Sequence, residues 1–316
     1  MSYNGKLFDA MAQIEDIVDT DKFLNMLNKN GVDKMALFSR NRNIWDWKDG
    51  DFYYFAERIK VALGDRIILG TSKRFDQAYE FDDKYLGELE YELTNHKPQF
   101  MGEIMFTHAD KHSGDSHVAQ ERYVNAASPT VNKLFDMVSK TNPVPVMIHW
   151  EVFNWERDLE PISAMINKYP NLTFIWIHCG FAFPWQVDHM LSTHPNLVAT
   201  ITKREMVRYD DLWISHTGDE LGGFQIWNPE FQKKVDGALI DNDGIIKPEW
   251  KELITKYQDR LMWGTDAHKR LRWNSYSRIV KIWRDIFPQL DDSIVKKITY
   301  DNAMRVYNVN NTDINN

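Results

Sequence analysis

The chain has 316 residues, of which 43% are hydrophobic and 13% aromatic, so it can form a large core and is not low-complexity disorder. Its formal net charge of -8 comes from interspersed acidic and basic residues without a basic stripe, which argues against nucleic-acid and anionic-membrane partners. The single cysteine excludes an intrachain disulfide, and no signal-like core or membrane-spanning apolar run is present, so we expect a cytoplasmic protein.

Short apolar segments alternate with segments that carry apolar residues at helical spacing. The predicted strands cover residues 6–9, 32–38, 66–70, 99–104, 144–149, 172–178, 196–202 and 260–263. The predicted helices cover residues 21–30, 52–63, 84–95, 129–140, 158–168, 184–191, 248–257, 275–286 and 291–307. Residues 203–244 are longer than a connection needs and are interpreted as an insertion or lid, and residues 310–316 as a flexible tail.

The predicted strands indicate an α/β architecture. Their apolar residues do not alternate with polar ones, which indicates burial on both faces, as in a parallel sheet covered by helices. Eight strand–helix alternations favour a closed (β/α)8, or TIM, barrel over an open sheet. Because no repeat or interdomain linker stands out, residues 1–309 are predicted to form one barrel domain, with its active-site mouth at the carboxyl ends of the strands.

Three predicted strands lead into a side chain that can bind a metal or move a proton. His149 ends the fifth strand, His178 ends the sixth, and Asp266 follows the eighth after a turn that Gly264 allows. Two imidazoles and a carboxylate suit Zn2+, and the aspartate is alternatively a proton acceptor for an attacking water. Either histidine alone is more often structural, but three such side chains at strand ends in one barrel mouth favour a functional site.

Further candidates lie beside these tips. Glu103 ends the fourth strand and is interpreted as a metal or substrate ligand, with a structural ion pair to a lysine or arginine equally open. His268 is assigned to substrate contact or to the cap of the next helix. Trp150 and Glu151 follow the fifth strand directly and are predicted to line the pocket.

Other titratable groups receive weaker interpretations. Cys179 is predicted to be a packed thiol and not a nucleophile, because an extended segment would point it away from the neighbouring histidine. A solvated loop is favoured over a metal cluster for the group His108, Asp110, His112, Asp115 and His117. Six cations follow the seventh and eighth strands, and they either bind an anionic ligand or lie at the surface: Lys203, Arg204, Arg208, Lys269, Arg270 and Arg272. No glycine-rich phosphate loop, serine elbow or CxxC pair is present, which argues against a nucleotide-dependent enzyme or a serine hydrolase.

Taken together, these features resemble the amidohydrolase superfamily over nearly the whole chain. The branch they resemble includes aminocarboxymuconate-semialdehyde decarboxylase, resorcylate decarboxylase and pyrone-dicarboxylate lactonase. The matching motifs occur in the family's order: Leu7–Ala10, Gly102–Ile104, Val144–His149, Lys168–Leu172, Ile175–Gly180, Met262–Asp266 and Asn302–Ala303. It is their order and spacing that make the resemblance specific.

The first strand departs from the family pattern. That pattern is Asp-x-His-x-His, with both imidazoles on the metal, whereas this chain has Met11 and Gln13 at the two histidine positions. A thioether and an amide are poor Zn2+ ligands, so metal binding is expected to be weaker by many orders of magnitude. By the resemblance, His149 corresponds to a ligand, His178 to a substrate-polarising group or second-metal ligand, and Asp266 to a ligand or base.

Three functions stay open. The first is hydrolysis or decarboxylation of a small organic substrate, with a degenerate or absent metal site, which the resemblance to the lactonase implies. In a hydrolysis, Asp266 would accept a proton from water while His178 or His149 polarises the carbonyl. The second is a metalloenzyme with a rearranged zinc site made by His149, His178, Asp266 and Glu103. The third is a catalytically inactive barrel that serves as a binding or scaffold protein.

The remaining expectations concern partners and cofactor. We expect a small-molecule substrate, carboxylated if the cations reach the mouth, and assign Gln13 to contact with it. The resemblance implies a homodimer, because relatives are often dimers. Protein purified without chelator is expected to hold less than one zinc ion per chain, and about one tightly held ion would contradict this.

Overall fold

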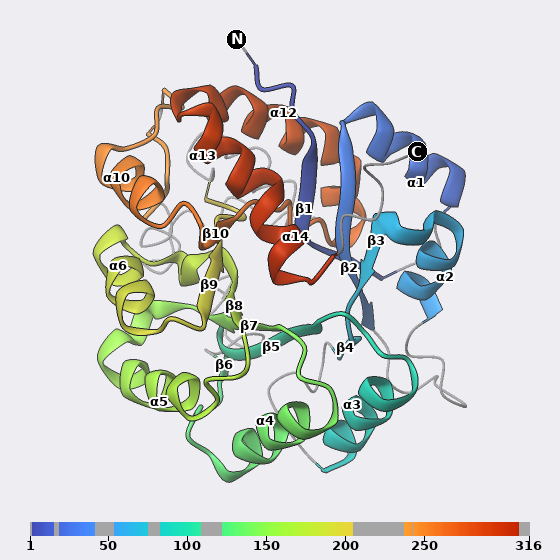
Figure 1. Cartoon of the computed structure of the whole chain (residues 1–316), viewed down its shortest axis with the longest axis vertical. Coiled ribbons are helices and arrows are strands. Elements are labelled where there is room, and N and C mark those ends of the chain that lie inside the picture. The colour runs from blue at the N-terminus through green and yellow to red at the C-terminus, as the bar shows by residue number, and fades with distance from the viewer. Residues whose placement is uncertain are drawn as a thin grey trace, which may run out of the picture.

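The computed structural model describes residues 2–15, 19–41, 54–74, 83–108, 122–204, 237–241 and 243–309. Within them, a ring of parallel strands is surrounded by helices, as Figure 1 shows. The strands of the ring are β1 (Leu7–Ile14), β2 (Val32–Asn41), β3 (Ile67–Leu69), β5 (Met101–His108), β7 (Val146–Trp150), β8 (Phe174–Trp176), β9 (Leu197–Thr200) and β10 (Leu261–Met262). The fold is a (β/α)8 barrel, as the sequence predicts.

The ring closes through two seams. The strands pair in the orders β1–β2–β3 and β10–β9–β8–β7–β5, and every one of these pairs is parallel. At the first seam, the Gln99 amide donates to the Leu69 carbonyl over 2.8 Å, which joins β3 to β5. At the second, the Gln13 amide donates to the Ala267 carbonyl over 2.7 Å, which joins β1 to the segment after β10.

Helices and two short strands complete the described part of the chain. β4 (Lys73–Arg74) pairs with β2, and β6 (Arg122–Tyr123) pairs antiparallel with β5. The helices are α1 (Thr20–Lys29), α2 (Tyr54–Leu63), α3 (Asp83–Asn95), α4 (Pro129–Thr141), α5 (Trp155–Lys168), α6 (Pro184–Thr193), α10 (Pro248–Lys256), α11 (Lys269–Asn274), α12 (Tyr276–Ile286), α13 (Asp292–Lys296) and α14 (Asn302–Val306). None of the described helices is long and apolar enough to cross a membrane.

Apolar side chains fill two layers. One cluster occupies the inside of the barrel and includes Met147, Ile175 and Met262, while a larger one fills the space between the strands and the helices. Alternation along each strand assigns side chains to one layer or the other. Burial of each large apolar side chain contributes about 1.5–3 kcal/mol. Tyr307 belongs to the inner cluster, and its hydroxyl donates to the Ala10 carbonyl over 2.7 Å.

The ends of two predicted strands need correction. The first strand does not stop at residue 9 but continues to Ile14, because residues 12–14 still pair with β2, so Met11 and Gln13 lie within β1. The sixth does not reach His178, because β8 ends at Trp176 and residues 178–181 have left-handed backbone. Gly180 is required in this turn, since a Cβ there would lie 2.5 Å from the Trp150 carbonyl oxygen.

Other boundaries shift less. β5 continues to His108 because β6 pairs with its end, so the prediction of a loop at residue 108 is wrong. The predicted closing helix is divided by a π-helical turn at Lys297–Asp301. Residues 205–236 of the predicted insertion and the whole predicted tail, 310–316, lie outside the described residues.

Candidate active site

The carboxyl ends of the strands bring the predicted side chains together. Glu103 lies on β5 and His149 on β7, while His178 and Asp266 lie just beyond β8 and β10. The rings of His149 and His178 meet edge to face, with centroids 5.4 Å apart. All four side chains belong to residues that are at most 5% exposed. Their charges therefore act on one another with little screening by water.

Asp266 is the centre of one half of this mouth. Its Oδ2 forms an ion pair with the Lys203 ammonium, and its Oδ1 accepts a hydrogen bond from Gln13 Nε2 over 2.8 Å. His178 Nε2 and His268 Nδ1 lie 3.7 and 3.4 Å from Oδ2. Burial alone would raise the pKa of Asp266, but Lys203 and His268 outweigh it and hold that pKa well below its usual range.

The backbone around Asp266 is strained. Asp266 has a φ of 46°, in the left-handed region that residues other than glycine rarely adopt. Its amide donates to the Met11 carbonyl over 2.8 Å, which ties the turn to β1. A Cβ at Gly264 would lie 2.9 Å from the Met11 amide nitrogen, so this close approach requires glycine. Strained backbone that holds a buried carboxylate at a barrel mouth points to a functional site.

Glu103 is the centre of the other half. Its Oε2 binds the Lys73 ammonium, and its Oε1 forms a hydrogen bond with His149 Nδ1. The other ring nitrogen, His149 Nε2, lies 3.1 Å from Glu151 Oε1. Burial would raise the pKa of Glu103, but the Lys73 charge and the contact with His149 keep it well below its usual range. Each half therefore pairs a buried carboxylate with a lysine.

Gln13 connects the two halves. Its Nε2 lies 2.8 Å from Asp266 Oδ1 and 3.3 Å from Glu103 Oε2, so one amide group donates toward both carboxylates. The opposite orientation would place the amide oxygen against two acceptors, which is unfavourable. Its buried Oε1 has no hydrogen-bond partner among the residues that the structure describes. Met11 is fully buried in the inner cluster.

His178 faces Asp266 at the mouth. Its Nε2 lies 3.7 Å from Asp266 Oδ2, and its Nδ1 lies 2.6 Å from the Thr202 hydroxyl and 3.3 Å from the Thr202 carbonyl oxygen. Burial lowers the pKa of His178 well below its usual value, which keeps the ring neutral. The positive charge beside Asp266 Oδ2 therefore comes from Lys203, which forms an ion pair with the same atom.

Trp150 is a correction to the predicted pocket lining. It is 1% exposed and stacks between Trp155 and Trp176, with centroid distances of 5.5 and 5.2 Å. Its indole donates to Asp158 Oδ2 over 3.2 Å. Because side chains alternate along a strand, the residue after His149 points out of the barrel into the helix layer.

The predicted cations separate into two kinds. Lys203 reaches Asp266, whereas Arg204 is buried beside Trp250 and donates to the Ala182 carbonyl over 2.7 Å. Arg272 donates to the Thr265 carbonyl over 2.6 Å. Arg208 lies outside the described residues, as do the side chains of Lys269 and Arg270.

Cys179 is packed, as predicted, though not for the reason given by an extended strand. Its φ is 45°, and its thiol donates to the Thr200 carbonyl over 3.3 Å. Burial raises the pKa of this thiol to about 12, so it is not a ready nucleophile.

The metal site that the resemblance implies does not fit the side chains present. Lys203 forms an ion pair with Asp266, which would be a metal ligand. Lys73 forms an ion pair with Glu103, the carboxylate on the other side of the mouth. On β1, the amide of Gln13 directs N–H groups, which cannot coordinate a metal, at both carboxylates.

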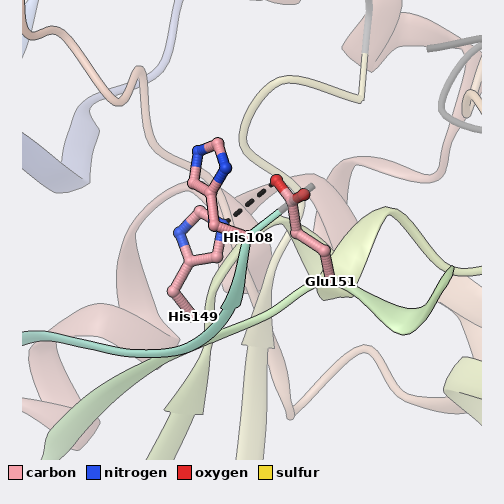
Figure 2. A group of neighbouring side chains, drawn as sticks. All are labelled: His108, His149 and Glu151. Carbon is pink, nitrogen blue, oxygen red and sulfur yellow. Dashed lines mark hydrogen bonds and ion pairs between the residues drawn. The ribbon is translucent and has the colours of Figure 1, made fainter. Parts of the chain in front are cut away.

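A second group of side chains does have the atoms for a metal ion. One ligand atom each from His108, His149 and Glu151 lie within 4.8 Å of one another. Figure 2 shows the two imidazoles one above the other, with Glu151 beside them and its contact to His149 drawn. The ring centroids of the histidines are 5.2 Å apart. Asp110, His112, Asp115 and His117 lie outside the described residues.

Lys73 was missed by the sequence interpretation. It lies on β4, shortly after β3, and is 4% exposed. The signal was available, because Thr71, Ser72 and Lys73 follow the third predicted strand as polar residues follow the others. The carboxyl end of that strand received no candidate, although every barrel strand contributes to the same mouth.

Comparison with known proteins identifies the family. The sequence model described as "Amidohydrolase" matches residues 110–309, more than half of the chain, so the protein belongs to the amidohydrolase family. No curated protein matches the chain by sequence.

Solved structures share the fold at low sequence identity. A dihydroorotase from Campylobacter jejuni has a TM-score of 0.56 and 16% identity, over 96% of this chain and 84% of that one. A dihydroorotase from Saccharomyces cerevisiae, in complex with 5-fluoroorotic acid, has a TM-score of 0.56 and 11% identity, over 98% and 86%. A probable 2-pyrone-4,6-dicarboxylic acid hydrolase from Acinetobacter baumannii, with citric acid bound, has a TM-score of 0.54 and 11% identity, over 96% and 99%.

Proposed function

We propose that the protein is a hydrolase of small, carboxylate-bearing substrates that uses Asp266 as proton acceptor for the attacking water. One observation carries the proposal: Asp266 is a buried carboxylate at a strained turn after β10, bonded to a lysine and next to two imidazoles. Its pKa is held well below the usual range, so it is ionised at neutral pH. A carboxylate has about four lone-pair positions, more than its contacts to Lys203 and Gln13 use.

In the proposed reaction, Asp266 takes a proton from water while the water oxygen attacks the carbonyl carbon of the substrate. Negative charge develops on the carbonyl oxygen, and the Lys203 ammonium is the cation nearest to Asp266 that can stabilise it. When the tetrahedral intermediate collapses, the carbon–oxygen or carbon–nitrogen bond breaks and the leaving group takes the proton from Asp266.

Two arginines near the mouth support an anionic substrate. The charge of Arg40 acts on Lys73, and the charge of Arg272 acts on Lys203. Both arginines are at most 8% exposed. A carboxylate on the substrate would be attracted to these cations.

A substrate panel tests the proposal. The full chain is incubated with 2-pyrone-4,6-dicarboxylate, dihydroorotate and the uncharged δ-valerolactone, and products are followed by chromatography and mass spectrometry. We expect ring opening of a carboxylated compound, at least about tenfold faster than of the uncharged lactone, and a loss of about 10²–10⁴ in kcat/KM for Asp266→Asn. Loss of carbon dioxide would indicate decarboxylation instead. Saturable binding without turnover, unchanged by Asp266→Asn, would support the inactive binding protein.

The homodimer and the cytoplasmic location stay predictions from the sequence. Neither enters the proposed chemistry, because every side chain used above comes from one chain. Light scattering on the purified protein tests the dimer.

A further inference from the structure

We propose that the ammonium groups of Lys203 and Lys73 replace the divalent metal ion for which the mouth of this family's barrel is built. Each lysine binds one of the two carboxylates that would hold or face such an ion, Asp266 and Glu103. The proposal concerns what compensates these buried charges, and it stands independently of the hydrolysis proposed above.

Charge balance is the first argument. The side chains of Lys73 and Glu103 are 5% and 2% exposed, and those of Lys203 and Asp266 are 11% and 1% exposed. A carboxylate removed from water this far is strongly unfavourable unless a positive charge lies against it. Two ammonium groups carry the same total charge as one divalent ion. The two pairs therefore compensate both carboxylates without a metal.

The space between His178 and Asp266 is the second argument. His178 Nε2 and Asp266 Oδ2 are 3.7 Å apart. In a metal centre, one ion would bind both an imidazole nitrogen and a carboxylate oxygen. Here the Lys203 ammonium is bonded to the same Oδ2, so its charge lies where the ion's charge would be needed.

Strand β1 supplies the third argument. The amide of Gln13 donates toward both carboxylates, over 2.8 and 3.3 Å, where a metal ligand would direct a lone pair. Met11 is fully buried in the apolar cluster inside the barrel. The residues at the two family histidine positions and the two lysines therefore form one consistent set, in which N–H donors replace ligands.

Zinc binding tests the replacement directly. The full chain, produced with zinc in the medium and purified without chelator, is analysed for zinc per chain and then titrated with zinc. We expect well under one equivalent in the natural protein. The pair Met11→His and Gln13→His restores the family ligands, and adding Lys203→Met should tighten zinc binding by at least about tenfold over that pair alone. Equal zinc affinity with and without Lys203 would overturn the proposal.

A displaced ion is the competing explanation, and the same experiment detects it. If the natural protein holds about one zinc per chain and loses it in His108→Ala or Glu151→Gln, the ion occupies the second group and the lysines do not replace it. That result would also overturn the proposal, whereas retained activity or its absence would not bear on it.

Thermal unfolding tests the charge compensation in the natural site. Lys203→Met leaves Asp266 buried without its cation and should lower Tm by at least about 5 °C. Changing both partners, Lys203→Met with Asp266→Asn, should recover at least half of that loss, because no buried charge is left alone. The control Lys281→Met removes an exposed lysine whose ammonium lies 2.6 Å from Asp285, and should change Tm by about 1 °C or less. A double variant no more stable than Lys203→Met would show that Lys203 does not act by compensating charge.

Discussion

Asp9 and Asp266 lie on either side of the seam between β1 and the segment after β10, and both are at most 1% exposed. Neutral donors surround Asp9: its carboxylate accepts from the Thr265 amide over 2.8 Å, the Thr265 hydroxyl over 2.6 Å and the Tyr276 hydroxyl over 3.0 Å. A lysine binds Asp266. Burial raises the pKa of Asp9 to about 6, while Lys203 helps to hold that of Asp266 well below its usual range.

The difference teaches that burial alone does not decide the pKa of a carboxylate in this barrel. A positive charge against the carboxylate lowers its pKa strongly, because the interaction is weakly screened in the interior. Asp9 ties the turn after β10 to α12 and β1, as a structural group does. Lys203 and His268 hold the pKa of Asp266 well below its usual range, so it is ionised, which the proposed reaction requires.

The largest expected effect separates the two residues by function. In an assay with a substrate found in the panel, Asp266→Asn should lower kcat/KM by about 10²–10⁴, because an amide cannot accept the proton from water. Asp9→Asn should lower it by less than about tenfold in protein that remains folded. Equal losses in both variants would remove the distinction.

Asp9, unlike Asp266, should contribute mainly to the free energy of unfolding. Asp9→Ala leaves the amide and hydroxyl of Thr265 and the hydroxyl of Tyr276 without their acceptor, which should cost about 2–4 kcal/mol of unfolding free energy. Urea unfolding measures this loss. Wild-type stability in Asp9→Ala would mean that water or another group replaces the carboxylate.

The pKa of Asp9 predicts a dependence of stability on pH. Its folded pKa is raised from 3.8 to about 6, so the folded state holds the proton more tightly than the unfolded state. This contribution is fully present below pH 3.8 and is lost as the pH rises through 6, with a total of about 3 kcal/mol. Asp9→Asn lacks it. The stability of the natural protein minus that of Asp9→Asn should therefore fall between pH 4 and pH 7, and a constant difference would contradict the raised pKa.

The barrel and the position of Asp266 were accessible from the sequence, but the contrast with Asp9 was not. Apolar strands without alternation predicted the barrel, and the residues after Met262 predicted Asp266 at the mouth, because both follow from local patterns. The partners of the two aspartates did not follow. Thr265 is adjacent to Asp266 in the chain but bonds Asp9 on β1, and that depends on how the ring closes.

The lysines show a second limit of the sequence. Lys203 was one of six cations after the seventh and eighth predicted strands, and nothing in its neighbours distinguished it from Arg204, which packs beside Trp250. The backbone makes the distinction, because Lys203 has a left-handed φ of 57°. The departure at Met11 and Gln13 was visible, but its compensation by Lys73 required the three-dimensional arrangement of β1, β4 and β5.

The smallest expected effect comes from an ion pair of the same chemistry at the surface. Lys296 lies 2.6 Å from Asp301, and their side chains are 66% and 41% exposed. Water and salt screen this pair, and ordering two side chains costs entropy, so Lys296→Ala should change the unfolding free energy by less than about 1 kcal/mol. Urea unfolding at low and high salt measures it. If this pair contributed as much as the buried pair of Lys203, contact distance and not burial would determine the strength of ion pairs here, and the contrast between Asp9 and Asp266 would lose its physical basis.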